Sequence, residues 1–250
     1  MNKPTVAVIL AAGKGKRMKS DLPKVLHRLD GKPLIRHLME TMQKIPLSRT
    51  IVVIGHKGEM VAEELKDFRV EFVWQKEQLG TGHAVMMAEE NLKEFDGTVL
   101  VAAGDVPFLS QKTIMGLIDI HNQNHPAATC LTAIFDDPAK YGRIIRQGGT
   151  DILADIIEFK DADEETIKIK EINTGTFCFN SRELFPILHR LDDNNAQKEF
   201  YLTDTIKILR KAGQVCRVWP INDPLEVTGI NSVEELAALE DTIRNKKQMN

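Results

Sequence analysis

The sequence predicts an α/β fold in which a mostly parallel, doubly wound sheet carries a small β-rich lobe. In the first half of the chain, short apolar segments alternate with segments of helical periodicity, which is typical of parallel sheets covered by helices on both faces. After residue 134 this alternation gives way to closely spaced strand-like segments. We therefore expect one continuous domain over residues 1–250, with the lobe built onto its sheet.

The first half is expected to supply the sheet and most of its helices. Strands are predicted at 5–11, 50–54, 70–74, 98–102 and 127–134, with helices at 33–44, 58–66, 81–91 and 110–123. Pro33 suits the first position of a helix, because its fixed φ angle is helical and its missing N–H would have no partner there.

The second half is expected to begin with a hairpin, whose strands at 141–146 and 152–159 flank a glycine-rich turn at 147–150. Further strands are predicted at 168–170, 174–179 and 214–219, and helices at 182–191, 203–211 and 233–246. The acidic segment 161–165 is expected to form a solvated loop.

Composition and charge exclude several classes of protein. A length of 250 residues with 42% hydrophobic content is enough for a sizeable core. A net charge of −3 and an aromatic content of 6% argue against a nucleic-acid-binding surface, and no apolar run is long enough to span a membrane. The three cysteines are far apart and form no C-x-x-C pair, which favours reduced thiols in a cytoplasmic protein.

The first strand runs directly into a loop that contains Gly13 and Gly15. A dinucleotide-binding loop and a P-loop would both need a glycine at position 18, where this chain has Met18. What remains is a glycine turn whose N–H groups can approach a phosphate, surrounded by Lys14, Lys16, Arg17, Lys19 and Lys24. Ligands bind at the carboxyl ends of strands in such sheets, so the loop predicts a polyphosphate site, with a solvated basic loop as the alternative.

Asp105 follows the strand at 98–102 and is expected at the same edge of the sheet. A carboxylate there suits Mg²⁺, which takes one or two carboxylates together with phosphate oxygens. The alternative is a turn residue that pairs with local N–H groups before Pro107.

A polar, glycine-containing segment, residues 75–83, follows the strand at 70–74. Gly80 and Gly82 allow the backbone to approach a flat ligand. The amide of Gln75 or Gln78 can both accept and donate, which would match N3–H and O4 of uracil. Thr81 is also expected to cap the following helix.

Three later segments contain further candidates. Glu158 and Asn173 can hydrogen-bond sugar hydroxyls or an acetamido group, and Asn231 offers a carbonyl oxygen to a metal. A turn role for Asn173 and a helix-start role for Asn231 are the alternatives.

Taken together, these segments resemble a known family. The segments that carry the resemblance occur in the order LAAGKGKRMKSDLPKVL, QKEQLGTGHA, GDVPF, YGRI, EINTG, YLTD and EVTGINS. From about residue 6 to about residue 239, the chain resembles the pyrophosphorylase (uridylyltransferase) domain of the bacterial N-acetylglucosamine-1-phosphate uridylyltransferases, which are sugar nucleotidyltransferases.

The resemblance implies a Rossmann-like nucleotide-diphospho-sugar transferase fold with a sugar-binding lobe. It also implies Mg²⁺-assisted transfer of UMP from UTP to N-acetylglucosamine-1-phosphate. Two basic residues, Arg17 and Lys24, would neutralise phosphate charge, and Asp105 and Asn231 would bind the metal. The residues that would hold the nucleotide are Leu10, Ala11, Ala12, Gly13, Gln75, Gly80, Thr81, Ala103 and Gly104. Those that would hold the sugar are Gly142, Glu158 and Asn173.

The chain departs from the family pattern in two places. Ala103 stands where the family usually has a larger, often aromatic side chain, which is expected to loosen the nucleotide pocket. No hexapeptide repeat of the family's C-terminal acetyltransferase β-helix is present, so acetyl transfer is not expected, and a monomer or dimer is expected instead of a trimer. The alternative functions are transfer to another sugar-1-phosphate, such as glucose-1-phosphate, and a non-catalytic nucleotide-sugar sensor.

Overall fold

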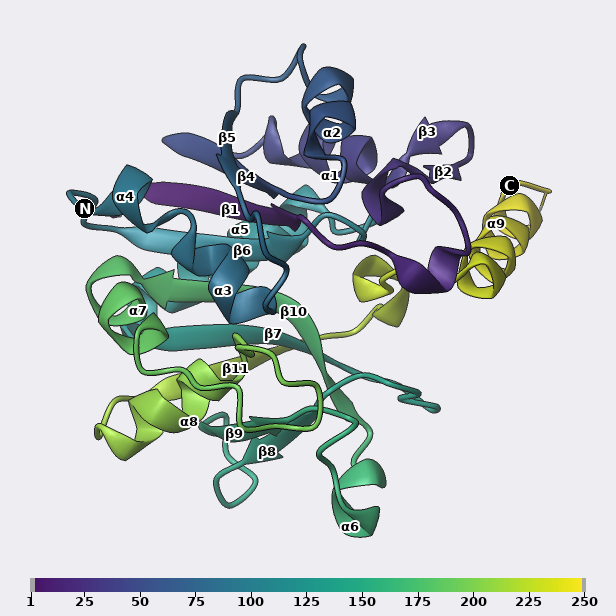
Figure 1. Ribbon diagram of the computed structural model, residues 1–250. Helices are drawn as coiled ribbons and strands as arrows, with labels where there is room; N and C mark the ends of the chain where they lie inside the picture. Colours follow the sequence, from purple (N-terminus) through teal and green to yellow (C-terminus); the bar gives the residue numbers. More distant parts are fainter. Residues whose placement is uncertain (1–2, 249–250) are drawn as a thin grey trace.

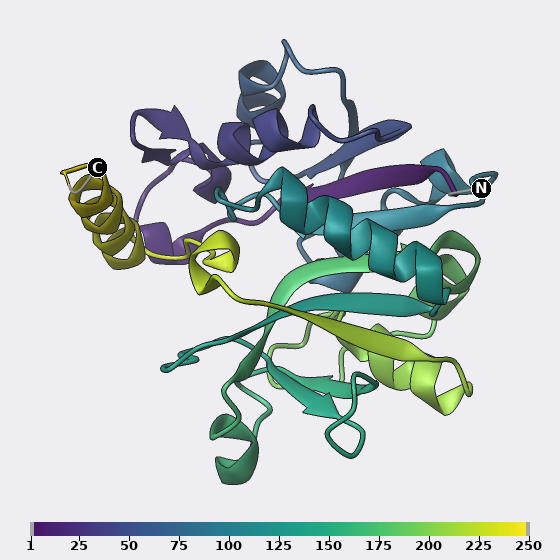
Figure 2. The ribbon, with the colours of Figure 1, turned by 180° about the vertical axis from the view of Figure 1, so that it is seen from behind.

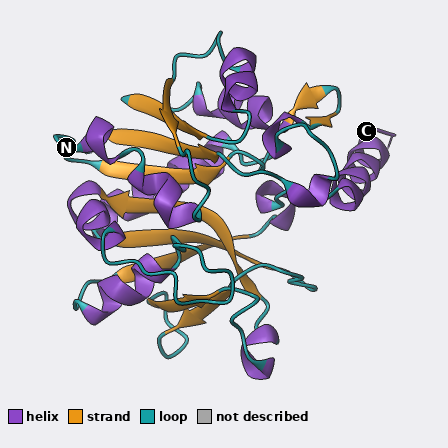
Figure 3. Cartoon of the chain, in the orientation of Figure 1, coloured by secondary structure: helices purple, strands orange, loops and turns teal. Residues whose placement is uncertain are grey.

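The computed structural model describes residues 3–248 and contains a nine-stranded sheet, drawn in Figures 1 and 3. Its main path runs in the order β11-β7-β10-β6-β1-β4-β5. These strands are β1 (Thr5–Ala11), β4 (Arg49–Ile54), β5 (Glu71–Trp74), β6 (Thr98–Ala103), β7 (Ala128–Ile134), β10 (Glu171–Asn180) and β11 (Cys216–Ile221).

Along this main path, four of the six neighbouring strand pairs are parallel, which confirms the prediction of a mostly parallel central sheet. β1 lies between β4 and β6 and is parallel to both, β5 is parallel to β4, and β11 is parallel to β7. The exception is β10, which lies between β6 and β7 and is antiparallel to both.

Helices cover both faces of the sheet, which confirms the doubly wound architecture (Figures 1 and 2). One face packs against α3 (Thr81–Met86), α4 (Glu89–Leu92), α7 (Ser181–Leu188) and α8 (Asp204–Lys211). The other packs against α1 (Leu34–Met42), α2 (Gly58–Glu64) and α5 (Gln111–Asn124). Successive residues of a strand point to opposite faces, so Val6 and Val8 lie in one core and Ala7 and Ile9 in the other.

The β-rich lobe is a hairpin of β8 (Arg143–Arg146) and β9 (Leu153–Ile157), attached to β10 through the pair Ile172 and Arg143. The strand predicted at 174–179 lies within β10, whereas the strand predicted at 168–170 was wrong, because these residues form a turn and an irregular segment before β10 begins at Glu171. Its register shifts between Asn173 and Phe177, where Gly175 has a φ of +76°. This irregularity lets one strand continue from the main sheet into the lobe.

Other predicted elements differ in detail. Residues 81–91 form two short helices, α3 and α4, and not one helix. Residues 161–165, predicted as a loop, include the start of α6 (Glu164–Ile167). The N-cap of α6, Asp163, accepts a hydrogen bond from the Thr166 N–H. Pro33 ends β3 and occupies the N-cap of α1. The helix therefore begins at Leu34, one residue later than predicted. A small hairpin of β2 (Arg28–Leu29) and β3 (Lys32–Pro33) was not predicted.

The C-terminal part of the chain returns to the opening loop. After the 3₁₀ turn η3 (Pro224–Val227), the helix α9 (Val233–Gln248) lies beside the first loop at the edge of the molecule (Figure 1). Met18 is 1% exposed and packs in a cluster with Ile230 and Leu239. Within residues 3–248, no helix is long and apolar enough to cross a membrane.

The stacked rings of Phe177 and Phe179 tie the antiparallel strand to the core. Their centroids lie 5.4 Å apart, and Phe179 is 0% exposed. We expect Phe179→Ala to lower the free energy of unfolding by about 3–5 kcal/mol, because it removes buried area and leaves a cavity. Urea unfolding measures the change. Ile134→Ala, at a position that is 61% exposed on neighbouring β7, should change it little, and equal effects would contradict this packing.

Candidate active site

Two cavities meet at the carboxyl ends of β1 and β6. The larger has a volume of about 760 Å³ and the smaller about 320 Å³. Both are lined by Arg17, Ala103 and Asp105. Because β1 and β6 pair in parallel with Leu10 opposite Ala103, the opening loop and the segment that carries Asp105 leave the sheet side by side. A ligand that fills both cavities would pass over Asp105.

The opening loop folds back on itself at Gly15. This residue has a φ of +59°, and a Cβ added to it would lie 2.7 Å from the Cβ of Lys24. Only glycine allows this close approach. Within the same loop, the short 3₁₀ turn η1 (Lys16–Met18) begins, and the Met18 N–H donates to the Gly15 carbonyl at 2.8 Å. Met18 anchors the loop in the cluster under α9, which explains why position 18 is apolar and not glycine.

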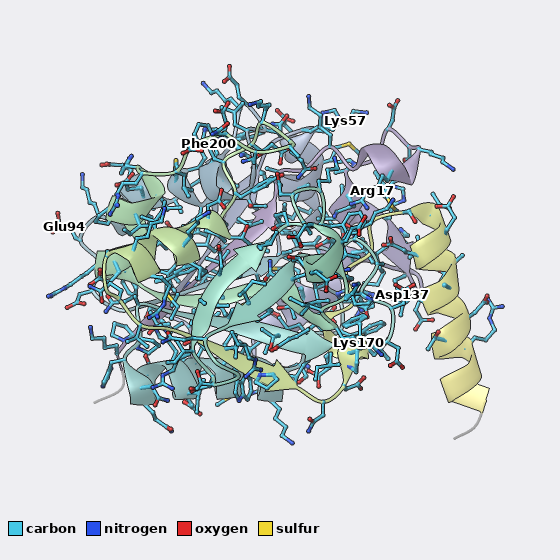
Figure 4. The ribbon with its side chains drawn as sticks, turned by 90° about the horizontal axis from the view of Figure 1, so that it is seen from below. Arg17, Lys57, Glu94, Asp137, Lys170 and Phe200 are labelled. Atoms are coloured by element: carbon cyan, nitrogen blue, oxygen red, sulfur yellow. The ribbon has the colours of Figure 1, made fainter. Side chains whose placement is uncertain are left out.

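The side chains of Lys24, Asp105 and Asn231 form a partly buried polar cluster that joins three distant segments. The Lys24 ammonium forms an ion pair with the Asp105 carboxylate and donates to Asn231 Oδ1 at 3.0 Å. Arg17 Nη2 donates to the same oxygen at 3.1 Å, and Figure 4 shows Arg17 on the α9 side of the molecule. Two cations therefore converge where the cavities meet.

The oxygens of Asp105 and Asn231 also fit a divalent metal. Both contact the same cation, the Lys24 ammonium, and both are oxygen donors of the kind that a hard divalent ion takes. Among residues 3–248, no group of three or more His, Cys, Asp and Glu side chains could hold a metal. A metal here would thus take one carboxylate and one amide oxygen from the protein and complete its shell with phosphate and water, as Mg²⁺ does.

Gln75 lies at the end of β5 in the wall of the larger cavity and is 3% exposed. Its Nε2 donates to the Gly80 carbonyl at 3.0 Å and lies 3.0 Å from His83 Nδ1. Gln78 Nε2 donates to the backbone carbonyls of Gln75 and Lys76. Since both amides give N–H groups to the protein, each presents its carbonyl oxygen to a ligand. This corrects the expectation that one amide would both donate to a base and accept from it.

The segment 78–82 lies flat against residues 199–202. Gly82 N–H donates to the Phe200 carbonyl, and Phe200 N–H donates to the Leu79 carbonyl, both at 2.8 Å. Gly80 has a φ of +117°, and a Cβ there would lie 2.6 Å from the Phe200 carbonyl oxygen. The Thr81 hydroxyl accepts from the Leu202 N–H at 3.0 Å, and the N-cap of α3 is Gly80, so Thr81 is not the cap that was predicted.

The smaller cavity is lined by Gly142, Glu158 and Asn173. Asn173 Oδ1 accepts from the Gly175 N–H at 2.9 Å, which leaves its NH₂ group as the donor for a ligand. Glu158 Oε1 accepts from the Thr203 hydroxyl at 3.0 Å. Burial raises the pKa of Glu158, and the hydrogen bond from Thr203 opposes this shift. The cavity thus sets an amide donor beside a carboxyl acceptor.

The structure gathers nearly all the predicted residues. The larger cavity is lined by Leu10, Ala11, Ala12, Gly13, Lys24, Gln75, Gly80 and Thr81, and the smaller by Gly142, Glu158, Asn173 and Asn231. Gly104 lines neither. Its N–H donates to the Leu10 carbonyl at 2.9 Å, and an added Cβ would lie 3.2 Å from that oxygen, so its role is packing between β6 and β1.

Several lining residues were not predicted. Lys160 and Glu199 line the larger cavity, and Glu235 lines the smaller one together with Tyr141, which belongs to the YGRI segment but had been given no role. The Tyr141 hydroxyl accepts from the Gly229 N–H at 3.0 Å, which holds the lobe against the segment before α9. The YGRI segment, which contains Tyr141 and the predicted Gly142, is the sequence signal for this residue. Glu199 and Glu235 carry no comparable signal, because isolated glutamates are common on exposed surfaces.

Comparison with known proteins places this chain in a recognised family. Residues 7–206 match the family described as the MobA-like NTP transferase domain. The chain is 47% identical over 240 residues to the "Bifunctional protein GlmU" of Streptococcus uberis, covering 96% of this chain and 52% of that protein. For the protein of the same name from Heliobacterium modesticaldum, identity is 46% over 250 residues, with 98% and 54% covered. The chain spans about half the length of these relatives.

The fold is also similar to that of solved structures at lower identity. The UDP-glucose pyrophosphorylase complexed with UDP-glucose superposes with a TM-score of 0.75 at 18% identity, covering 98% of this chain and 100% of that chain. This similarity shows the fold alone, whereas the sequence match extends over most of the chain. The chain therefore belongs to the family of MobA-like NTP transferase domains.

Proposed function

We propose that this protein transfers UMP from UTP to N-acetylglucosamine-1-phosphate, forming UDP-N-acetylglucosamine and pyrophosphate with the help of Mg²⁺. The observation that carries the proposal is the meeting of two cavities at Arg17 and Asp105. One cavity would hold the nucleotide and the other the sugar, so that their phosphates meet over these two side chains. The sequence similarity to the GlmU proteins supports the same assignment.

The hydrogen-bonding groups of the larger cavity support a uracil base. Gln75 and Gln78 present carbonyl oxygens, which need a donor on the ligand. Uracil has an N–H at N3, whereas the N3 of cytosine is itself an acceptor. Gly80, which has no side chain, lines the same cavity as these amides and leaves room for a planar ring to approach the backbone.

The reaction at the junction needs no protein nucleophile. A phosphate monoester is largely ionised at pH 7, so an oxygen of the sugar phosphate can attack the α-phosphorus of UTP directly. The new P–O bond forms as the bond to the departing pyrophosphate breaks. Because two anions must approach each other, catalysis consists mainly of positioning and charge neutralisation. Arg17 and Lys24 supply positive charge, and Mg²⁺, when bound by Asp105 and Asn231, would supply more.

The smaller cavity supports an acetylated sugar. An acetamido group offers one carbonyl acceptor and one N–H donor, which complement the NH₂ of Asn173 and the carboxyl of Glu158. Glucose-1-phosphate has no acetamido group, so the NH₂ of Asn173 and the carboxyl of Glu158 would lack these hydrogen-bond partners. A site built for hydrogen bonds discriminates against a ligand that lacks them.

The direct test of the proposal is pyrophosphate release from UTP and N-acetylglucosamine-1-phosphate, with Mg²⁺ and then with EDTA. Release that requires Mg²⁺ and is fastest with the acetylated sugar is the expected result. Release only with glucose-1-phosphate would overturn the sugar assignment. Nucleotide-sugar binding without any release would favour a sensor.

Asp105→Asn should lower kcat by about 10²–10³-fold, because it removes the one carboxylate that lines both cavities and pairs with Lys24. Steady-state kinetics at saturating Mg²⁺ measure the change. Asp119→Asn, at an exposed position of α5, is the matched control and should retain full activity. Wild-type turnover in the Asp105→Asn variant would contradict the proposed role of this carboxylate.

Asn173→Ala should lower kcat/KM for N-acetylglucosamine-1-phosphate by about tenfold, since it removes one donor to the acetamido group. The slower reaction with glucose-1-phosphate should change little, so the ratio between the two sugars would fall. Asn222→Ala, at an exposed position outside both cavities, serves as the control. Equal losses with both sugars would show that Asn173 does not read the acetamido group.

A further inference from the structure

We propose that His83 is a positioning residue that fixes the amide of Gln75 with its carbonyl oxygen toward the base, and that this selects a base with a ring N–H. The inference rests on the proposed function, because it concerns how the nucleotide site would choose among bases. It adds a residue that makes no direct bond to the ligand.

The orientation of the Gln75 amide follows from the Gly80 carbonyl. One end of the amide lies 3.0 Å from this oxygen, and a backbone carbonyl can only accept. The atom that faces it must therefore be the NH₂ nitrogen, Nε2. The opposite orientation would place two oxygens against each other.

The same nitrogen then fixes the state of His83. Nε2 lies 3.0 Å from His83 Nδ1, and its second hydrogen points to a ring nitrogen that must accept. In this arrangement His83 Nδ1 accepts, and the ring proton lies on Nε2. With Gln75 only 3% exposed, a second N–H without a partner would be buried and unsatisfied. Gln75 Oε1 has no hydrogen-bond partner in the described part of the chain, which leaves it for a ligand.

The packing around α3 holds the histidine ring in place. The ring centroids of His83 and Phe200 lie 6.4 Å apart at an angle of 38°. Phe200 is itself fixed on both sides by backbone hydrogen bonds, to the Leu79 carbonyl and from the Gly82 N–H. Figure 4 shows Phe200 and Arg17 at separate places on the molecule, and Glu199, the neighbour of Phe200 in sequence, lines the larger cavity. The imidazole acceptor therefore has a defined position.

The chemical consequence is selection by hydrogen-bond direction. With only Oε1 presented, the base must donate at this point. Uracil does so through N3–H, whereas the unprotonated N3 of cytosine would face another acceptor. Without the His83 acceptor, the Gln75 amide keeps only one of its two hydrogen bonds, the one to the Gly80 carbonyl. It can then rotate and offer its NH₂ group to cytosine.

The first test is calorimetric binding of UTP and CTP, each with Mg²⁺, to the wild-type protein and to His83→Leu and His83→Asn. Wild type should prefer UTP. His83→Leu should weaken UTP binding by about three- to tenfold, the effect of one lost hydrogen bond, and leave CTP binding unchanged or tighter. His83→Asn should restore the preference, because its side-chain oxygen can accept from Gln75. The control His189→Leu changes a histidine that pairs with Glu89 outside both cavities and should have no effect.

A UTP-to-CTP ratio that stays at the wild-type value in His83→Leu would overturn the inference, as would a wild-type protein that binds both nucleotides equally. If His83→Leu does not fold, ¹⁵N NMR of the wild-type histidine decides. We expect a neutral ring protonated at Nε2, and a proton on Nδ1 would overturn the inference. UTP selection without pyrophosphate release would contradict only the proposed function, whereas release with an unaltered ratio in His83→Leu would contradict only this inference.

Discussion

The structure depends on one partly buried contact, in which the Lys24 ammonium pairs with the Asp105 carboxylate and donates to the Asn231 carbonyl oxygen. Lys24 and Asn231 are 207 positions apart in the sequence. A largely buried carboxylate needs a partner, so Asp105 holds the opening loop closed and the segment before α9 in place. Gly15 permits this closure, and Met18 secures it from the other side.

The antiparallel strand β10 connects the core to the smaller cavity. Its second half places Phe177 and Phe179 in the core, while its first half carries Asn173 into the cavity wall. The register shift at Gly175 separates the half of β10 that lies in the core from the half that lines the smaller cavity. Asn173, which lines the smaller cavity, is thereby held by a strand whose other half is buried in the core, and this favours a site of fixed shape.

Much of this arrangement could be predicted from local patterns. The apolar segment of β1 and the position of Asp105 after β6 place the loop and the carboxylate at one edge, because parallel strands end on the same side. The direction of β10 could not be predicted, because a buried parallel strand and a buried antiparallel strand have the same apolar sequence pattern. The packing role of Gly104 and the donor bonds of Gln75 and Gln78 also depend on neighbours that local sequence does not specify.

The most direct measurement is a crystal structure of the protein with UDP-N-acetylglucosamine and Mg²⁺. The account predicts the uracil beside Gln75 in the larger cavity, the acetamido group beside Asn173 and Glu158 in the smaller one, and the pyrophosphate across Arg17 and Asp105. A nucleotide-sugar that lies within one cavity alone, or with its base in the smaller cavity, would contradict it.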